Sequence, residues 1–432
     1  MGIEAAKDEA QIAKGASKGF STSPFTLYPL LHPNYSLFTV LRMLTSGPMT
    51  RSVFFCILTL GLVACATPAK SPSPSPQTAG EPATSKPAAA RPAETSVEAL
   101  PANAPVDLTP VPFEVARANF VRDTAAKYGI APATIEATLS QAKFRDDIVA
   151  LMSRPAERVK PWSEYRPNFI TAARIDGGRA FMAKHHDALQ KVQASTGVPA
   201  EIITAIIGVE TSYGNFTGKH RVIDALYTLA FRYPRSGNPE RAAYEQRREL
   251  FFRDELAQLF ALSREENLDL LGLTGSYAGA MGMGQFMPSS YRQFAVDGNG
   301  DGRRDLFKSH DDVFASIANY FLKKGGERGG WIPGGAVVAR AELQPGFPEF
   351  NPETWTADYS LADLAKRGYR PLEKVAPDAT ATLVSLEGST GKQYWLGFQN
   401  YYAITRYNNS KMYAMAVYQL SQAIAGKEIP GA

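Results

Sequence analysis

A run of apolar residues that ends in one acidic residue is the feature that most constrains this chain. Between Pro199 and Glu210 the sequence carries four isoleucines and a valine, which predicts a buried helix opened by proline. A carboxyl group at the end of such a helix loses its water, and desolvation disfavours its charged form. We therefore expect Glu210 to keep its proton near neutral pH, as the general acid of a glycosidase must.

Glu210 alone does not establish a catalytic site, because a glutamate near a helix end is more often solvated or used as a cap. The residues that follow it, Thr211 to Gly214, supply hydroxyl groups and a turn, which suits the edge of a cleft. A second segment, from Gly275 to Tyr291, is rich in glycine, which lets the backbone approach a bulky ligand closely. It lacks the lysine of a phosphate loop. Gln285 in this segment is then a hydrogen-bond partner for a sugar, and the alternative is a tightly packed helix junction.

Composition excludes several classes of protein. The 432 residues are 44% hydrophobic, so a substantial core is available. The net charge of +4 is small for this length and argues against a nucleic-acid binder. The two cysteines, Cys56 and Cys65, lie in one short apolar segment, so the folded body has no disulfide framework and no cysteine-based zinc site.

The pattern after residue 112 is mostly helical and predicts a mainly α fold with a small β element, in the α+β class. Short β-branched stretches at 336–339 and 381–386 predict a small sheet. The predicted helices cover 113–128, 132–142, 176–196, the segment from Pro199 through Glu210, 241–262, 311–324 and 411–424.

The first part of the chain has the pattern of an exported, anchored protein. Residues 49–64 place an arginine before an apolar run, as in a secretory signal peptide. Leu62–Cys65 resembles the bacterial lipobox, in which the cysteine is lipidated; the alternative is a buried core strand. Met49 is then the expected start, and residues 1–48 are an over-extended, disordered beginning. The Pro/Ala/Ser-rich residues 65–112 predict a mobile, extended tether.

Three motifs together resemble one known family. They are Glu210-Thr-Ser-Tyr-Gly, the segment from Gly275 to Tyr291, and Ile404-Thr-Arg-Tyr-Asn408. Their sequences and spacing resemble the membrane-bound lytic murein transglycosylase B family, over roughly 113–425. The resemblance implies a lysozyme-like, goose-type core with an added α-helical lobe, within a catalytic body over 113–432.

The same resemblance implies the chemistry. Members of this family cut the β-1,4 bond between N-acetylmuramic acid (MurNAc) and N-acetylglucosamine (GlcNAc) of peptidoglycan without water, in cell-wall turnover and remodelling. They leave 1,6-anhydro-MurNAc ends and need no cofactor for catalysis. Glu210 would be the single acid and base. We see no partner carboxylate near the motifs, although an ordinary glycosidase needs one.

The resemblance also implies how the substrate is held. Ser276 and Gln285 would line the cleft near the scissile bond, and Tyr402 and Tyr407 would form part of the opposite wall. Each tyrosine is equally compatible with a half-buried core ring. Arg235 would contact the peptide or the saccharide.

Location and partners follow from the same family and from the lipobox. A lipid on Cys65 would anchor the chain, and Ala66, which is not aspartate, implies sorting to the outer membrane, facing the periplasm. The expected partners are peptidoglycan glycan strands, the membrane and proteins of cell-wall synthesis. We expect a monomer and no nucleic-acid partner.

The loop 297–311 opens like an EF-hand, with oxygen ligands at alternate positions and then a glycine. It departs from that pattern at the twelfth position, where Lys308 cannot bind a cation. The family has a lengthened loop of this kind, and the alternative is a plain surface turn. The resemblance implies a structural calcium or sodium ion held by Asp297, Asn299, Asp301, the backbone carbonyl of Arg303, and Asp311.

Two other functions stay open from the sequence. A hydrolytic muramidase would leave a reducing end instead of an anhydro end. A peptidoglycan-binding scaffold without activity is a third interpretation, and the intact Glu210 argues against it.

Overall fold

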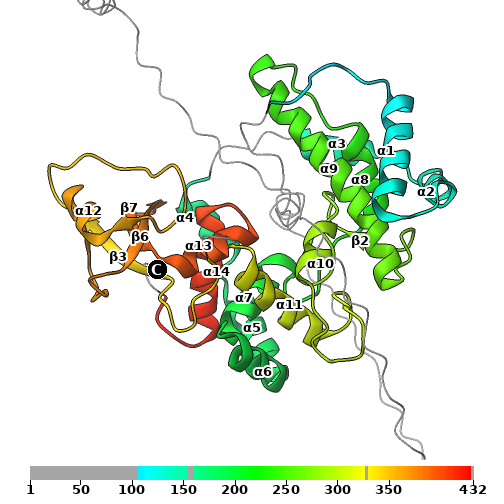
Figure 1. Cartoon of the computed structure of the whole chain (residues 1–432). Helices are drawn as coiled ribbons and strands as arrows, with labels where there is room; N and C mark the ends of the chain where they lie inside the picture. The colour runs from blue at the N-terminus through cyan, green and yellow to red at the C-terminus, as the bar shows by residue number, and fades with distance from the viewer. Residues whose placement is uncertain (1–104, 154–159, 326–328, 430–432) are drawn as a thin grey trace, which may run out of the picture.

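The computed structural model describes residues 105–153, 160–325 and 329–429. The predicted signal peptide, Cys65 and most of the predicted tether lie outside these residues. The described part forms three neighbouring groups of elements, which Figure 1 shows from the helical group at upper right to the β group at left.

A helical lobe is built from the first three helices and two later ones, which pack on one another. Its helices are α1 (Phe113–Tyr128), α2 (Pro132–Leu139), α3 (Asp146–Ser153), α8 (Val222–Phe231) and α9 (Pro239–Glu266).

The central group carries the motifs. Its elements are α4 (Trp162–Tyr165), η4 (Arg166–Asn168), α5 (Ala172–Lys184), α6 (His186–Thr196), α7 (Ala200–Thr211), α10 (Pro288–Phe294), α11 (His310–Lys323), α13 (Gln399–Tyr407) and α14 (Lys411–Ile424). A two-stranded ribbon joins this group to the helical lobe: β1 (His220–Arg221) pairs antiparallel with β2 (Thr274–Gly275).

A five-stranded antiparallel sheet forms the third group, in the order β4-β6-β7-β3-β5. Its elements are β3 (Val338–Leu343), β4 (Tyr359–Ser360), α12 (Leu361–Lys366), β5 (Tyr369–Pro371), β6 (Thr380–Gly388) and β7 (Gly391–Gly397). The long β6–β7 hairpin runs in register from Thr382 opposite Gly397 to Gly388 opposite Gly391. A small hydrophobic cluster around Tyr369 and Leu383 gives this group a core of its own.

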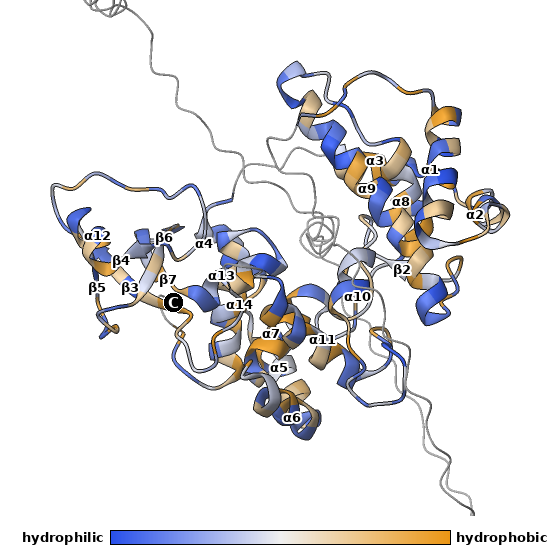
Figure 2. Cartoon of the chain, viewed as in Figure 1, coloured by the Kyte–Doolittle hydropathy of each residue, from blue (hydrophilic) through white to orange (hydrophobic). Residues whose placement is uncertain are grey.

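The main core runs through the helical lobe and the central group, and α7 lies within it. Every residue of α7 except Glu201 is buried, because the helix packs against α5, α6, α11 and α14. Figure 2 shows the apolar colour of α7 at the middle of this group. The predicted buried helix is therefore confirmed, and it brings its terminal carboxyl group into the centre of the molecule.

The predicted fold class is confirmed, and most predicted helices are present. The helices at 113–128 and 411–424 have the predicted bounds, whereas the one from Pro132 ends at Leu139. The single helix predicted over 176–196 is wrong, because the chain leaves helical geometry at His185 (φ −112°, ψ 25°) and α5 and α6 are separate. The ring of His185 stacks on His310 with centroids 4.2 Å apart, so a tertiary contact overrides the local pattern.

The described residues contain no single helix that is long and apolar enough to cross a membrane. The pair α6 and α7 meets that requirement only jointly, with a bend of 116° between them.

Candidate active site

Glu210 lies in the last turn of α7 and is 3% exposed. The helix ends directly after it, in a turn of three successive residues with left-handed backbone: Ser212 (φ 49°), Tyr213 (φ 63°) and Gly214 (φ 84°). Two of these residues are not glycine, so this turn is costly unless the surrounding structure holds it. The predicted position of Glu210, at the end of a buried helix, is what the structure shows.

The turn is held by Tyr213, whose side chain packs back onto α5 and α7. Its hydroxyl donates a hydrogen bond to the carbonyl of Arg174 (2.6 Å). A Cβ added to Gly208 would lie 2.7 Å from the Tyr213 ring, so glycine is needed on α7 where the ring covers it. The Arg174 guanidinium in turn donates to the carbonyl of Gly208. These contacts fix the end of α7, and with it the backbone that carries Glu210.

Tyr413 of α14 is the direct partner of the carboxyl group. Its hydroxyl donates to Glu210 Oε1 at 2.6 Å, across 203 residues of sequence. Burial raises the pKa of Glu210 to about 8, and the hydrogen bond from Tyr413 acts in the opposite direction. The described residues contribute no second carboxylate to this pKa shift. Glu210 is therefore protonated at neutral pH because it is buried, not because another acid repels it.

The glycine-rich segment forms a wall beside the end of α7. Thr211 Oγ1 donates to the carbonyl of Met283 (2.9 Å), and Gln285 Nε2 donates to the carbonyl of Thr217 (3.0 Å). Gln285 itself has a left-handed backbone (φ 51°), which places its amide under the loop that follows Glu210. The structure thus brings Gln285 to the Glu210 region, with its amide nitrogen bound to protein carbonyls.

Ser276 is also placed in this wall, where it is nearly buried. Its Oγ accepts a hydrogen bond from the backbone N–H of Ala280 (3.0 Å), and its own N–H donates to the carbonyl of Ala280 (2.9 Å). The hydroxyl hydrogen of Ser276 is not used in this hydrogen bond, because Oγ is its acceptor.

Tyr402 and Tyr407 both lie in α13, and both residues are buried (7% and 4% exposed). The Tyr407 hydroxyl donates to the carbonyl of Gly284 (2.6 Å) and so ties α13 to the glycine-rich wall. The guanidinium of Arg406 lies over the Tyr402 ring, 4.6 Å from its centroid. Both residues therefore offer little surface to a sugar in this structure.

Arg235 is not brought to the Glu210 region by its contacts. It lies between α8 and α9 and donates to Glu249 Oε2 (2.6 Å) and Gln246 Oε1 (2.8 Å) of α9. A contact with peptide or saccharide, as predicted, requires Arg235 to exchange this ion pair for the ligand.

The candidate metal loop has the backbone of the predicted turn. Asp297 accepts hydrogen bonds from the N–H groups of Gly300 (2.6 Å) and Gly302 (2.7 Å), and these bonds lower the pKa of its carboxyl group. Gly302, at the sixth position, has φ 85°, the conformation for which such loops use glycine. Gly298 packs so closely on α11 that a Cβ would lie 2.3 Å from the Asp311 carbonyl. The start of the lengthened loop therefore lies close to Asp311, the predicted last ligand.

The side chains of the loop are not gathered around one point. No three histidine, cysteine or acidic side chains of the described residues lie together as metal ligands would. Asp301 Oδ1 accepts from the N–H of Arg303 (2.9 Å), and Asn299 Nδ2 donates to Asp301 Oδ2 (3.1 Å). The backbone has the conformation of a cation-binding loop. The carboxylates of Asp297 and Asp301, however, accept hydrogen bonds from N–H groups of the loop itself.

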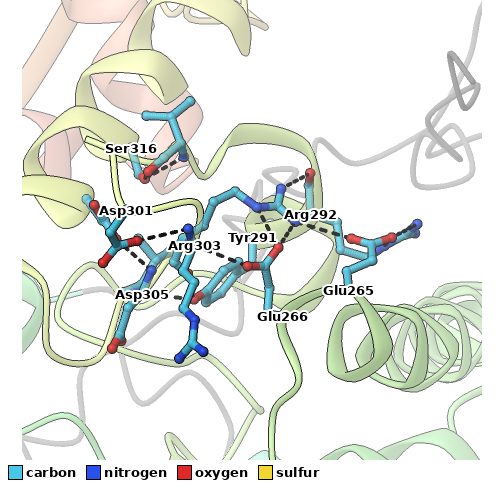
Figure 3. Close-up of polar contacts among 12 residues, drawn as sticks. Glu265, Glu266, Tyr291, Arg292, Asp301, Arg303, Asp305 and Ser316 are labelled. Atoms are coloured by element: carbon cyan, nitrogen blue, oxygen red, sulfur yellow. Dashed lines mark hydrogen bonds and ion pairs between the residues drawn. The ribbon is translucent and has the colours of Figure 1, made fainter. Parts of the chain in front are cut away.

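Figure 3 shows how this loop is joined to the rest of the site. Arg304 Nε donates to Glu266 Oε1 (2.7 Å) at the end of α9, and its Nη1 donates to the carbonyl of Arg292 (3.0 Å) in α10. Tyr291 of α10 donates its hydroxyl to the Arg304 carbonyl. Because α10 begins within the glycine-rich segment, the loop is linked to the wall of the site.

Sequence reasoning missed Tyr413, whose hydroxyl is bonded to Glu210. A signal was present: Tyr413 lies on the apolar face of the predicted helix 411–424, and a buried tyrosine hydroxyl usually has a hydrogen-bond partner. The sequence does not say which partner it is.

Comparison with known proteins identifies the family. A family model described as the transglycosylase SLT domain matches residues 112–422. The chain belongs to this family. It is 42% identical over 317 residues to membrane-bound lytic murein transglycosylase B of Escherichia coli K12, covering 71% of this chain and 82% of that protein. The resemblance predicted from the motifs is thus confirmed.

Solved structures agree with this assignment. The E. coli lytic transglycosylase Slt35, in complex with calcium, is 40% identical with a TM-score of 0.62, covering 72% of this chain and 92% of that one. SltB3 of Pseudomonas aeruginosa, in complex with NAG-anhNAM-pentapeptide, is 31% identical with a TM-score of 0.62, covering 74% and 81%. The chain has their lysozyme-like fold and is a peptidoglycan lytic transglycosylase.

Proposed function

We propose that this lytic transglycosylase uses Glu210 as its single acid and base to cut the β-1,4 MurNAc–GlcNAc bond. The observation that carries the proposal is a buried carboxyl group with a pKa of about 8, bonded to Tyr413 and acted on by no second carboxylate of the described residues. A retaining or inverting hydrolase would need that second group.

The reaction needs no water. Glu210 gives its proton to the glycosidic oxygen as the bond from that oxygen to C1 of MurNAc breaks. The C6 hydroxyl of the same MurNAc attacks C1, and its proton passes to the Glu210 carboxylate. The products are a GlcNAc hydroxyl end and a 1,6-anhydro-MurNAc end, and Glu210 is protonated again. The acetamido group of the substrate stabilises the positive charge at C1.

Tyr413 has a role in both steps. It occupies Oε1 of Glu210, which leaves Oε2 to face the glycosidic oxygen and then the C6 hydroxyl. Its hydrogen bond stabilises the carboxylate that exists between the two steps, and so brings the pKa of Glu210 closer to the working pH.

The proposed substrate contacts come from the wall and the α8–α9 loop. Ser276 offers its hydroxyl and Gln285 its side-chain carbonyl near the scissile bond. Tyr402 and Tyr407 support the opposite side, and Arg235 is the proposed contact for a stem peptide. SltB3 was solved with a muropeptide that has such a stem, which supports a glycan strand as the partner.

For the loop 297–311 we propose a structural calcium ion. The left-handed Gly302, the approach of Gly298 to Asp311 and the likeness to a structure in complex with calcium support it. The ion would draw the carboxylates together by cancelling their repulsion and would strengthen the link from the loop through α10 to the wall. It would take no part in the reaction, because its ligands are hard oxygens of a closed loop. The implied ligands are Asp297, Asn299, Asp301, the Arg303 carbonyl and Asp311.

We also propose a membrane-anchored enzyme facing the periplasm. The relative at 42% identity is named as membrane-bound, and Cys65 follows a lipobox-like sequence. The tether 65–112 would let the catalytic body reach the peptidoglycan from the outer membrane. Proteins of cell-wall synthesis are further proposed partners. A Cys65→Ser chain that stays in the membrane fraction would contradict the anchor.

Mass spectrometry of digested sacculi tests the activity. The expected products end in 1,6-anhydro-MurNAc, and Glu210→Gln should yield none of them. Glu201→Gln, a change on the same helix, is the matched control. This variant should release the same anhydro products from sacculi as the wild type. Reducing ends from the wild-type chain would support the hydrolytic muramidase instead.

A further inference from the structure

A glycan strand in this site needs an apolar surface, because the C–H faces of sugar rings pack on aromatic rings. The two tyrosines expected to supply it, Tyr402 and Tyr407, are almost wholly buried. Among the large hydrophobic side chains that are exposed in the described residues, two are aromatic: Phe216 (50%) and Phe347 (44%). Phe347 belongs to the β group, whereas Phe216 follows Glu210 by six residues.

The loop that carries Phe216 is fastened at both ends. On one side, the N–H of Phe216 donates to the carbonyl of Thr211 (3.0 Å), the last residue of α7. On the other side, the carbonyl of Thr217 accepts from Gln285 Nε2 (3.0 Å). Gly218 (φ 105°) then passes so close to the wall that a Cβ would lie 2.0 Å from the Gly275 carbonyl.

These contacts hold the backbone of Phe216 in the short loop between Glu210 and the attachment of Thr217 to the glycine-rich wall. Exposing a phenyl ring to water is unfavourable, and burying its exposed half on a ligand recovers that free energy. Since the loop is already ordered, binding a sugar there costs little further conformational entropy.

We infer that Phe216 is a platform for a GlcNAc ring of the glycan strand next to the scissile bond. This deepens the proposed function and rests on it. GlcNAc fits better than MurNAc, because MurNAc carries a lactyl group and stem peptide on O3 that hinder flat stacking. Phe216 is therefore a specificity-determining residue, because stacking on its ring favours GlcNAc over MurNAc. It touches none of the reacting atoms.

Binding in a chain that cannot cut tests the inference. The parent is Glu210→Gln, and the probe is a peptide-free strand of alternating GlcNAc and MurNAc, titrated by calorimetry. We expect Phe216→Ala to weaken binding about tenfold, as an aromatic contact of this size does. Phe216→Trp should bind within about twofold of the parent, because it keeps an aromatic face. Phe347→Ala, the matched control, should bind like the parent.

Two further readouts separate a platform from a structural role. With Glu210 intact, Phe216→Ala should raise KM about tenfold and leave kcat nearly unchanged, because uniform binding is lost. Its melting temperature should equal that of the wild type. Unchanged affinity of Phe216→Ala, or a loss that Phe216→Trp shares, would overturn the inference. Anhydro products in the parent mixture would instead refute the assignment of Glu210.

Discussion

Replacing Glu210 with glutamine should stabilise the protein, and the gain should grow with pH. Burial raises the pKa of Glu210 from 4.5 to about 8. A group whose pKa is raised by folding contributes fully to stability below its unfolded pKa, and this contribution is lost as pH rises toward the folded pKa. Glutamine has the same shape, accepts the Tyr413 hydrogen bond and does not titrate, so the variant escapes this loss.

The size of the effect follows from the two pKa values. Each pH unit between them costs the wild type about 1.4 kcal/mol of unfolding free energy. The advantage of Glu210→Gln should therefore be under about 1 kcal/mol at pH 5, about 3 kcal/mol at pH 7 and about 5 kcal/mol at pH 9. Removing an acid that is buried at this cost should therefore stabilise the fold.

Urea unfolding followed by circular dichroism at these three pH values measures the advantage. Glu201→Gln is the matched control: Glu201 lies in the first turn of the same helix, partly exposed and paired with Lys427 at 3.2 Å. Its difference from the wild type gives the baseline for a change of glutamate to glutamine on this helix. A Glu210→Gln advantage that is the same at pH 5 and pH 9 would refute the buried, protonated acid.

Three further perturbations test other parts of the site. Tyr413→Phe should lower kcat about tenfold and shift the Glu210 limb of the pH–rate profile to higher pH, because the carboxylate loses a hydrogen bond. A limb that does not move would contradict the role of Tyr413 in stabilising the carboxylate. Calcium at about a hundred times its Kd should stabilise the chain by about 2.7 kcal/mol, and Asp301→Asn should reduce this gain; no heat and no melting shift on titration would exclude the site. Gly218→Ala should cost about 3 kcal/mol in urea unfolding, because its Cβ would collide with the Gly275 carbonyl at left-handed φ; a neutral result would mean that this contact is not tight.

The sequence could predict the parts of the site that depend on neighbouring residues. The burial of α7 followed from its density of isoleucines, and the raised pKa of Glu210 followed from that burial. The glycines of the wall were expected to let a bulky ligand approach, whereas Gly282 and Gly284 lie against the protein itself, at the Leu306 carbonyl and the Tyr407 hydroxyl, as the alternative of a tightly packed junction describes. For α7 and Glu210 the physical cause lies within one segment.

The rest depended on segments that meet only in the fold. At the break, His185 stacks on His310 of another helix, and the local helical pattern does not contain that contact. The burial of Tyr402 and Tyr407 was left open by the sequence, because an aromatic residue is equally suited to a core and to a sugar. The partner of Glu210 is Tyr413 of α14. Local periodicity predicts this helix but does not show that it packs against α7.

The contacts of the site indicate why the acid and the wall should act as one unit. Thr211 Oγ1 bonds to the Met283 carbonyl at the end of α7, and the Gln285 amide bonds to the Thr217 carbonyl six residues on. The proposed acid and the proposed substrate wall are therefore joined twice within eight residues. The proposed catalysis by one group in two successive steps depends on such fixed placement, because this mechanism uses no second carboxylate to correct an error in the position of the first. Weakening either joint should then lower kcat even where Glu210 and its pKa are unchanged.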